Sequence, residues 1–161
     1  MLSRRQLLGA SPLLLILCGC DKPAVLSAPP VPTRQTKVLL EAVTAEQNLI
    51  WLYDNASATY PQLNDVLATL RAEHAAHLTQ LRATVVEPPG KHVPTTVTQK
   101  PVIGKTHQDA LIQLRGAEQG AVAALMGRLE GASPSLAQLY ASIAASETTH
   151  VGVLNARITA T

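Results

Sequence analysis

The chain has 161 residues, of which 47% are hydrophobic, with no phenylalanine and a formal net charge of +2. Without Arg4 and Arg5 the count of basic residues falls from 13 to 11, which equals the 11 acidic residues. The remaining chain is then formally neutral, so nothing in its charge calls for a nucleic-acid partner. Both cysteines, Cys18 and Cys20, lie near the amino terminus, so no disulfide framework is expected to hold the domain together.

The first residues are typical of an export signal rather than of a fold. Residues 3–8 resemble a twin-arginine signal, residues 13–17 form a short apolar run, and residues 17–20 resemble a lipobox. We therefore expect residues 1–19 to be a signal peptide, and Cys20 to become lipidated. The protein would then be exported and anchored through lipid to the outer face of a bacterial cytoplasmic membrane. A secreted protein without this anchor is the alternative.

The rest of the chain predicts a short tether followed by one helical domain. Residues 20–37 combine prolines with small and polar residues, which favours an extended tether. From there on, alanine and leucine recur at steps of three and four residues, which predicts an all-α domain over residues 38–158. Four helices are expected, over about residues 38–59, 62–85, 107–130 and 135–158.

The connections between these helices are of two kinds. Pro61 and Pro134 each stand near the first turn of a helix that follows its predecessor closely, which favours two helical hairpins. Residues 87–105, between the hairpins, are more than a neighbouring antiparallel helix needs. This segment can cross the length of a bundle. The pattern therefore predicts an antiparallel four-helix bundle built from two helical hairpins with one long crossover.

Six polar side chains interrupt the apolar faces of these helices. Steps of three and four residues keep side chains on one helix face, and such steps bring acids and imidazoles into the expected core: Glu46, His74, His77, Glu118, Glu147 and His150. A buried carboxylate without a partner is strongly destabilising. A divalent cation could satisfy all six groups, because carboxylate oxygen and neutral imidazole nitrogen are both good ligands.

These positions resemble the ferritin-like superfamily of dinuclear carboxylate proteins, in which two helices give one glutamate each and two give Glu-x-x-His. Glu46 and Glu118 match the single acids, and residues 147–150 match one Glu-x-x-His motif. In the second motif, residues 73–77 read Glu-His-Ala-Ala-His, so His74 stands where the family has a bridging acid. The resemblance covers residues 38–158 and implies a ferritin-like fold with iron or manganese in its core.

The histidine at position 74 changes the charge balance that this resemblance implies. Three carboxylates against two divalent ions leave one positive charge uncompensated. A hydroxide could supply the missing charge, and so could Glu73 if it turned inward, although it lies about 100° around the helix from His74. Otherwise the site would hold a single ion, or would favour zinc or copper, which accept more imidazole.

Two functions from different classes follow. The first is an exported metalloprotein that uses one or two ions for metal handling or for oxygen or peroxide redox chemistry. The second is a metal-free lipoprotein that serves as a binding or scaffold module at the cell envelope. In that case Glu147 with His74, and Glu118 with His77, would form buried pairs that fix the register of the helices.

The sequence also bears on two tyrosines, on other kinds of catalytic site and on partners. Tyr53 and Tyr140 lie on the same helix faces as the six polar residues, and either packs in the core or forms a hydrogen bond to one of them. Neither a Gly-x-Ser-x-Gly elbow nor a phosphate-binding glycine loop occurs in the sequence. Apart from the membrane, the sequence identifies no partner, and it leaves open whether two copies of the chain form a homodimer.

Overall fold

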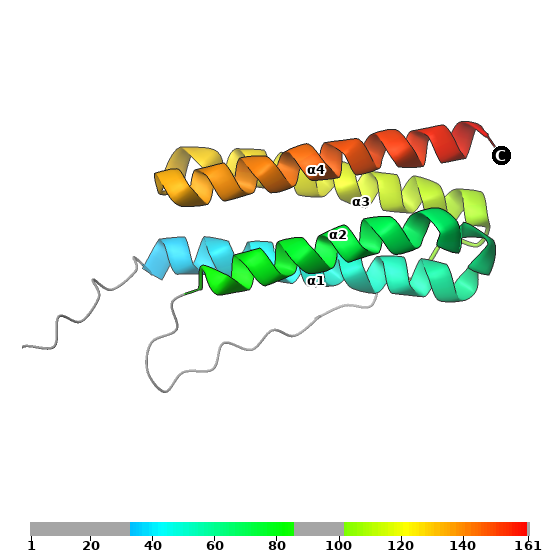
Figure 1. Cartoon of the computed structure of the whole chain (residues 1–161), viewed down its shortest axis with the longest axis horizontal. Helices are drawn as coiled ribbons and strands as arrows, with labels where there is room; N and C mark the ends of the chain where they lie inside the picture. The colour runs from blue at the N-terminus through cyan, green and yellow to red at the C-terminus, as the bar shows by residue number, and fades with distance from the viewer. Residues whose placement is uncertain (1–32, 86–101, 161) are drawn as a thin grey trace, which may run out of the picture. The chain divides into compact units, whose positions relative to one another are not determined.

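The computed structural model describes residues 33–85 and 102–160. The predicted signal peptide, Cys20, the tether up to residue 32 and most of the predicted crossover lie outside the described residues. Within the described ranges every regular element is helical and four long helices pack together, which confirms the all-α prediction (Figure 1). No helix in these ranges is long and apolar enough to span a lipid bilayer.

Four α-helices and two short 3-10 helices make up the described fold. In chain order they are α1 Thr33–Thr59, η1 Pro61–Leu63, α2 Asn64–Ala83, α3 His107–Gly127, η2 Leu129–Gly131 and α4 Pro134–Thr159. Two helix ends differ from the prediction. The first turn of the predicted second helix and the last turn of the predicted third helix are separate 3-10 helices, η1 and η2, and do not belong to α2 and α3.

The first helix starts earlier than expected. It begins at Thr33 rather than at residue 38, so the last residues assigned to the tether are helical. The reason lies in the sequence: Pro32 is the last proline before this helix, and residues 34–37 contain neither proline nor glycine. A proline at the start of a helix is well tolerated, so nothing prevents the helix from extending back to this point.

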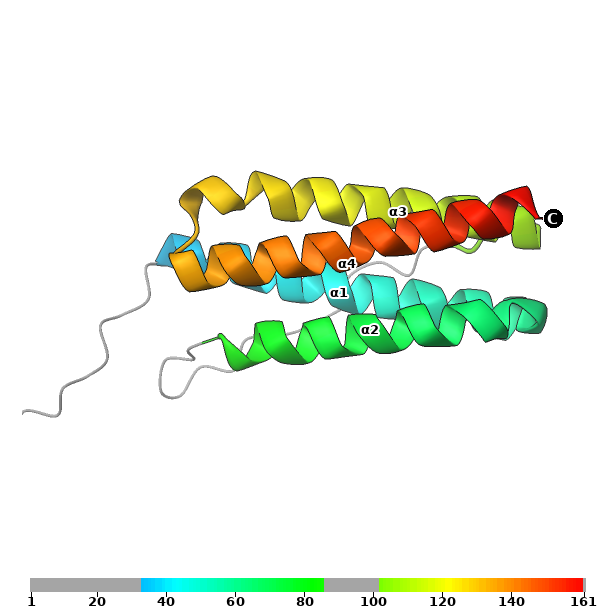
Figure 2. The same cartoon turned by 45° about the horizontal axis from the view of Figure 1, so that its top comes forward.

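Two apolar clusters fill the bundle, and a polar layer separates them. One cluster contains Leu39, Ala42, Val43, Leu81, Leu125, Leu136, Tyr140, Ile143 and Ala144. The other contains Leu52, Tyr53, Ala56, Leu63, Leu67, Leu70, Leu111, Leu114 and Leu154. On every long helix the two clusters stand on opposite sides of the acids and imidazoles named above. Helix α1 packs mainly on α2, and α3 mainly on α4 (Figure 2). Helix α1 also packs against α3.

The start of α3 is fixed by hydrogen bonds around Gly104. The hydroxyl of Tyr60 donates to the carbonyl oxygen of Gly104 at 2.6 Å, and the amide N–H of Gly104 donates to Oε1 of Gln113 at 2.9 Å. A Cβ atom added to Gly104 would lie 2.6 Å from the Cβ of Asp109. Thr106 then caps the helix by accepting the backbone N–H of Asp109 at 3.0 Å. These contacts hold the start of the helix that carries Glu118.

Candidate metal centre

The structure brings all six sequence-predicted residues into one buried layer. Helix α1 contributes Glu46, α2 contributes His74 and His77, α3 contributes Glu118, and α4 contributes Glu147 and His150. Each of the six has at most 8% of its surface exposed. This burial follows from the three- and four-residue spacing, because the same faces carry the leucines of the two apolar clusters.

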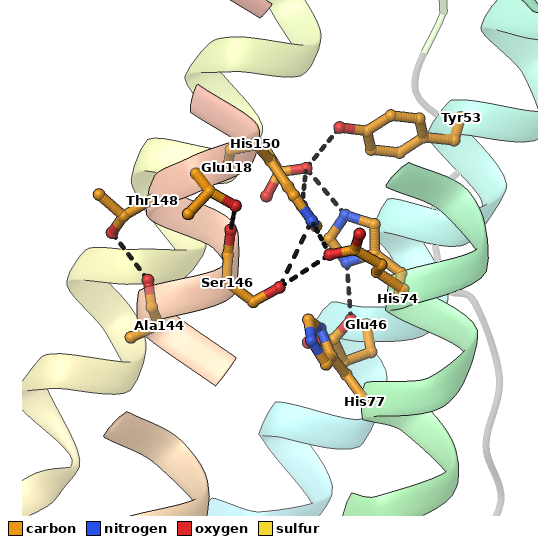
Figure 3. A network of polar contacts seen from close by, with 11 residues as sticks. Glu46, Tyr53, His74, His77, Glu118, Ala144, Ser146, Thr148 and His150 are labelled. Atoms are coloured by element: carbon orange, nitrogen blue, oxygen red, sulfur yellow. Dashed lines mark hydrogen bonds and ion pairs between the residues drawn. The ribbon is translucent and has the colours of Figure 1, made fainter. Parts of the chain in front are cut away.

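His74 lies at the centre of this layer (Figure 3). Its Nδ1 atom is 2.9 Å from Oε2 of Glu46, and its Nε2 atom is 2.8 Å from Oε1 of Glu118. A carboxylate can only accept hydrogen bonds, so both ring nitrogens donate and the ring is an imidazolium. Burial alone would lower the pKa of His74, but Glu118 and Glu46 outweigh it and raise this pKa to about 9.

Glu118 is the most heavily hydrogen-bonded acid of the layer. Besides His74, its Oε1 atom accepts the hydroxyl of Tyr53 at 2.5 Å and lies 3.4 Å from Nδ1 of His150. Burial would raise the pKa of Glu118, yet the two imidazoles and the tyrosine together lower it to about 2. Tyr53 therefore both packs in the core and holds a candidate ligand, the two roles left open by the sequence.

Glu147 is an acid whose pKa is raised, in contrast to the lowered pKa of Glu118. Burial, followed by the negative charges of Glu46 and Glu118, raises the pKa of Glu147 to about 9, so its carboxyl group is neutral at pH 7. Its Oε2 atom has no hydrogen-bond partner among the described residues. Glu46 differs because it faces His74 directly and also lies 3.6 Å from Nδ1 of His77.

The buried pairs differ from those expected for a metal-free core. The predicted partners were Glu147 for His74 and Glu118 for His77, whereas His74 is hydrogen-bonded to Glu46 and Glu118. The reason is the direction of the His74 ring. It projects from α2 between α1 and α3, so its two nitrogens meet the acids of those helices rather than the acid of α4.

Glu73 holds a role that the sequence reasoning did not assign to it. Its carboxylate accepts the Nε2–H of His150 at 2.8 Å and the hydroxyl of Ser146 at 3.0 Å, while 46% of its side chain is exposed. It therefore does not replace the missing bridging acid. Instead it fixes the His150 ring so that Nδ1 faces Glu118, the arrangement in which a carboxylate orients a metal-binding histidine. One feature could have indicated this role: Glu73 lies about 100° around the helix from His74, on the side towards α4.

The donor atoms form two groups that could hold a metal ion. Glu46, His74, His77 and Glu147 offer one group, and His74, Glu118 and His150 the other; within each group the ligand atoms lie within 4.8 Å of one another. Ligand atoms around a tetrahedral ion with bonds of about 2.0 Å are about 3.3 Å apart, so modest side-chain rotations would suffice. Oxygen and imidazole donors of this kind suit several transition metals and do not select one.

Several atoms of this layer have no hydrogen-bond partner among the described residues. They are Nδ1 of His77, Oε2 of Glu118, Oε2 of Glu147 and Nδ1 of His150. All four are atoms that coordinate metals, so the residues present fit a metal ion. In comparisons with known proteins, no family model, no curated protein and no solved structure matches the chain.

Proposed function

We propose that the protein is an exported, membrane-anchored metalloprotein of ferritin-like architecture that binds one or two transition-metal ions between its four helices. One observation carries the proposal: buried ligand atoms from three helices converge on one layer without hydrogen-bond partners among the described residues. Unsatisfied buried polar atoms are rare in proteins because each is destabilising by about 1–3 kcal/mol. A cation in this layer would satisfy several of them at once.

The ferritin-like part of the proposal is supported by the order of the apolar clusters along the chain. On α1 the cluster that contains Leu39 precedes the cluster that contains Leu52, and on α2 the order is reversed. The same reversal distinguishes α3 from α4. Successive helices that present the clusters in alternate order run antiparallel, so two hairpins joined by a long connection are the topology that fits.

The chain's own residues define what such a centre would do. Glu46, His77 and Glu147 would ligate an ion on one side of His74, and Glu118 and His150 on the other. The apolar clusters exclude bulk water from both sides. A bound transition metal would supply Lewis-acid or redox chemistry, for metal handling or for reactions of oxygen or peroxide. Iron or manganese is the first candidate, with zinc or copper as the alternative.

Metal content is the direct test. Full-length protein purified without chelator should contain at least one transition-metal ion per chain by elemental analysis. His77→Ala or Glu147→Ala should lower this content, because each removes a ligand from the group that contains Glu46. Glu73→Gln should weaken metal affinity by about 10–100-fold without lowering the number of ions at saturation, because it only releases the orientation of His150.

Asp65→Asn is the matched control for the Glu73 variant. Asp65 is an exposed acid on the same helix, so its replacement removes the same charge without touching the layer. This variant should bind metal like the native chain. A native protein that contains no metal, and that melts at one temperature with or without added iron, manganese or zinc, would contradict the proposal.

The membrane anchor has a separate test, because its support is the lipobox-like sequence ending at Cys20. In a bacterial host that processes lipoproteins, the native chain should incorporate a labelled fatty acid and sediment with membranes. Cys20→Ser should lose both the label and the sedimentation. A native chain that carries no lipid and stays in the supernatant would show that the anchor is absent.

The alternative is a metal-free lipoprotein that acts as a binding or scaffold module at the envelope. One observation favours it: both ring nitrogens of His74 already have carboxylate partners without any ion. Under this alternative a chelator should leave the melting temperature unchanged. Under the metal hypothesis the chelator should lower it, since an ion at about a hundred times its dissociation constant stabilises by about 2.7 kcal/mol.

A further inference from the structure

The two candidate ligand groups share one residue, His74, and they use opposite sides of its ring. Nδ1 faces Glu46, which belongs to the first group, at 2.9 Å. Nε2 faces Glu118, which belongs to the second group, at 2.8 Å. The two nitrogens of an imidazole point away from each other, so a single ion cannot bind both. The groups are therefore two sites with a common ligand between them.

We propose that His74 binds two metal ions at once, one through each ring nitrogen, so that its imidazolate bridges a four-ligand site and a three-ligand site. This inference rests on the proposed metal function and specifies how the two ions are arranged. On binding, each ring nitrogen of His74 exchanges its proton for a metal ion, and the carboxyl group of Glu147 loses its proton as it becomes a ligand. These three protons leave to solvent.

The charges of the described residues support this bridge. The first site has the carboxylates of Glu46 and Glu147, which neutralise one divalent ion. The second site has a single carboxylate, that of Glu118, with the neutral imidazole of His150. An imidazolate at position 74 adds the one negative charge that the second site lacks. The substitution of histidine for a bridging acid thus keeps a pair of divalent ions neutral, without a hydroxide and without Glu73.

The two sites also differ in how completely the protein fills them. The first offers four ligands, which closes a tetrahedral shell, as in structural sites. The second offers three, which leaves a position for water or a small anion, as in catalytic sites. The extra contacts lie around the second site, where Tyr53 holds Glu118 at 2.5 Å and Glu73 holds His150 at 2.8 Å. The open position is thus surrounded by ligands whose orientation is fixed.

This arrangement sets a longer separation between the ions than a carboxylate bridge does. Two metals in an ordinary dinuclear site lie about 3.5–4 Å apart. With metal–nitrogen bonds of about 2.0 Å on either side of an imidazole ring, the ions would lie about 6 Å apart. Two copper(II) ions joined by an imidazolate remain magnetically coupled over that distance, which provides a signature that independent sites lack.

Copper(II) added to the metal-depleted full-length protein tests the bridge. The native chain should bind two copper ions, and the electron paramagnetic resonance signal of the filled protein should fall far below that of two independent ions. X-ray absorption should place a second copper about 6 Å away and not at 3.5–4 Å. His74→Gln should lose this coupling, so that any copper it still binds gives its full signal. His107→Gln, at the start of α3 and outside the layer, should behave like the native chain.

The outcomes separate this inference from the proposed function. A native chain that binds no metal overturns both. Saturation at one ion per chain, or two ions with full uncoupled signal, overturns the bridge and leaves the metal function standing. The coupled signal of the native chain is decisive by itself, so the test remains valid if the His74 variant does not fold.

Discussion

Glu118→Leu should lower the free energy of unfolding of the metal-free protein by about 3–5 kcal/mol, the usual result of removing one partner from a buried ionic network. The replacement leaves the imidazolium of His74 with one carboxylate in place of two and deprives the Tyr53 hydroxyl of its acceptor. Leucine has a similar volume, so a cavity contributes little. Urea denaturation at pH 6 in the presence of a chelator measures the loss.

Glu147→Leu is the matched comparison, because it removes the other kind of acid from the same layer. Glu147 is buried and neutral at this pH, and its Oε2 atom has no hydrogen-bond partner among the described residues. Replacing such a group with an apolar side chain should be neutral or stabilising in the metal-free protein. If the two variants lost equal stability, the distinction between an ionised acid that is bonded to His74 and a neutral acid would be wrong.

The metal-free protein should lose stability as the pH rises from 4.5 to 9, and most steeply above pH 6.5, where His74 adds to the effect of Glu147. His74 has its pKa raised from 6.5 to about 9, and Glu147 has its pKa raised from 4.5 to about 9. Each group therefore holds a proton in the folded state that the unfolded chain releases, and stability falls with pH wherever this is so. One pKa unit corresponds to about 1.4 kcal/mol, so the summed loss should reach several kcal/mol.

At acid pH the dependence reverses, and the stability of the metal-free protein should fall as the pH falls. The pKa of Glu118 falls from 4.5 to about 2 in the folded protein, so its contribution is present above pH 4.5 and is lost as the pH falls towards 2. The metal-free protein should thus be most stable near pH 4.5, where the rise in stability due to Glu118 ends and the fall due to Glu147 begins. Chemical denaturation with a chelator, repeated from pH 3 to 9, would reveal a maximum there, and a flat profile up to pH 9 would contradict these shifts.

Bound metal should oppose this trend, because ligands must lose their protons before they coordinate. The stability gained from added metal should therefore grow between pH 6 and 8, the range in which the metal-free protein weakens. The same denaturation series with saturating metal measures the difference. If the stability gained from added metal became smaller as the pH rises, the ion would bind somewhere other than the layer of buried acids and imidazoles.

The burial of the six polar residues was predictable because helical spacing is a strong constraint. Once Leu39 and Val43 define the inner face of α1, a further step of three residues reaches Glu46, and the same reasoning applies to the other helices. The helix ends next to Pro61 and Pro134 were also predictable, because a proline is favoured at a first turn. These features depend on local sequence alone.

The partners of His74 depend on tertiary geometry that a sequence pattern does not contain. Spacing places a side chain on a face, but the rotation and height of each helix decide whether its ring meets α1, α3 or α4. For the same reason Glu73 was expected either to enter the core or to remain apart, and instead it contacts His150 from the edge of the helix. The composition of residues 20–37 predicted a tether up to residue 37, but residues 33–37 contain neither proline nor glycine and are helical.

Glu73 gives the interior a connection to solvent. Its carboxylate is 46% exposed and holds Nε2 of His150, whose other nitrogen lies 3.4 Å from the fully buried Glu118. Polar groups therefore lead from bulk water to the middle of the apolar core, with one step, from His150 to Glu118, that is not a hydrogen bond. A small rotation of the His150 ring would close this step, so the buried acids could exchange protons with the medium while the bundle stays folded.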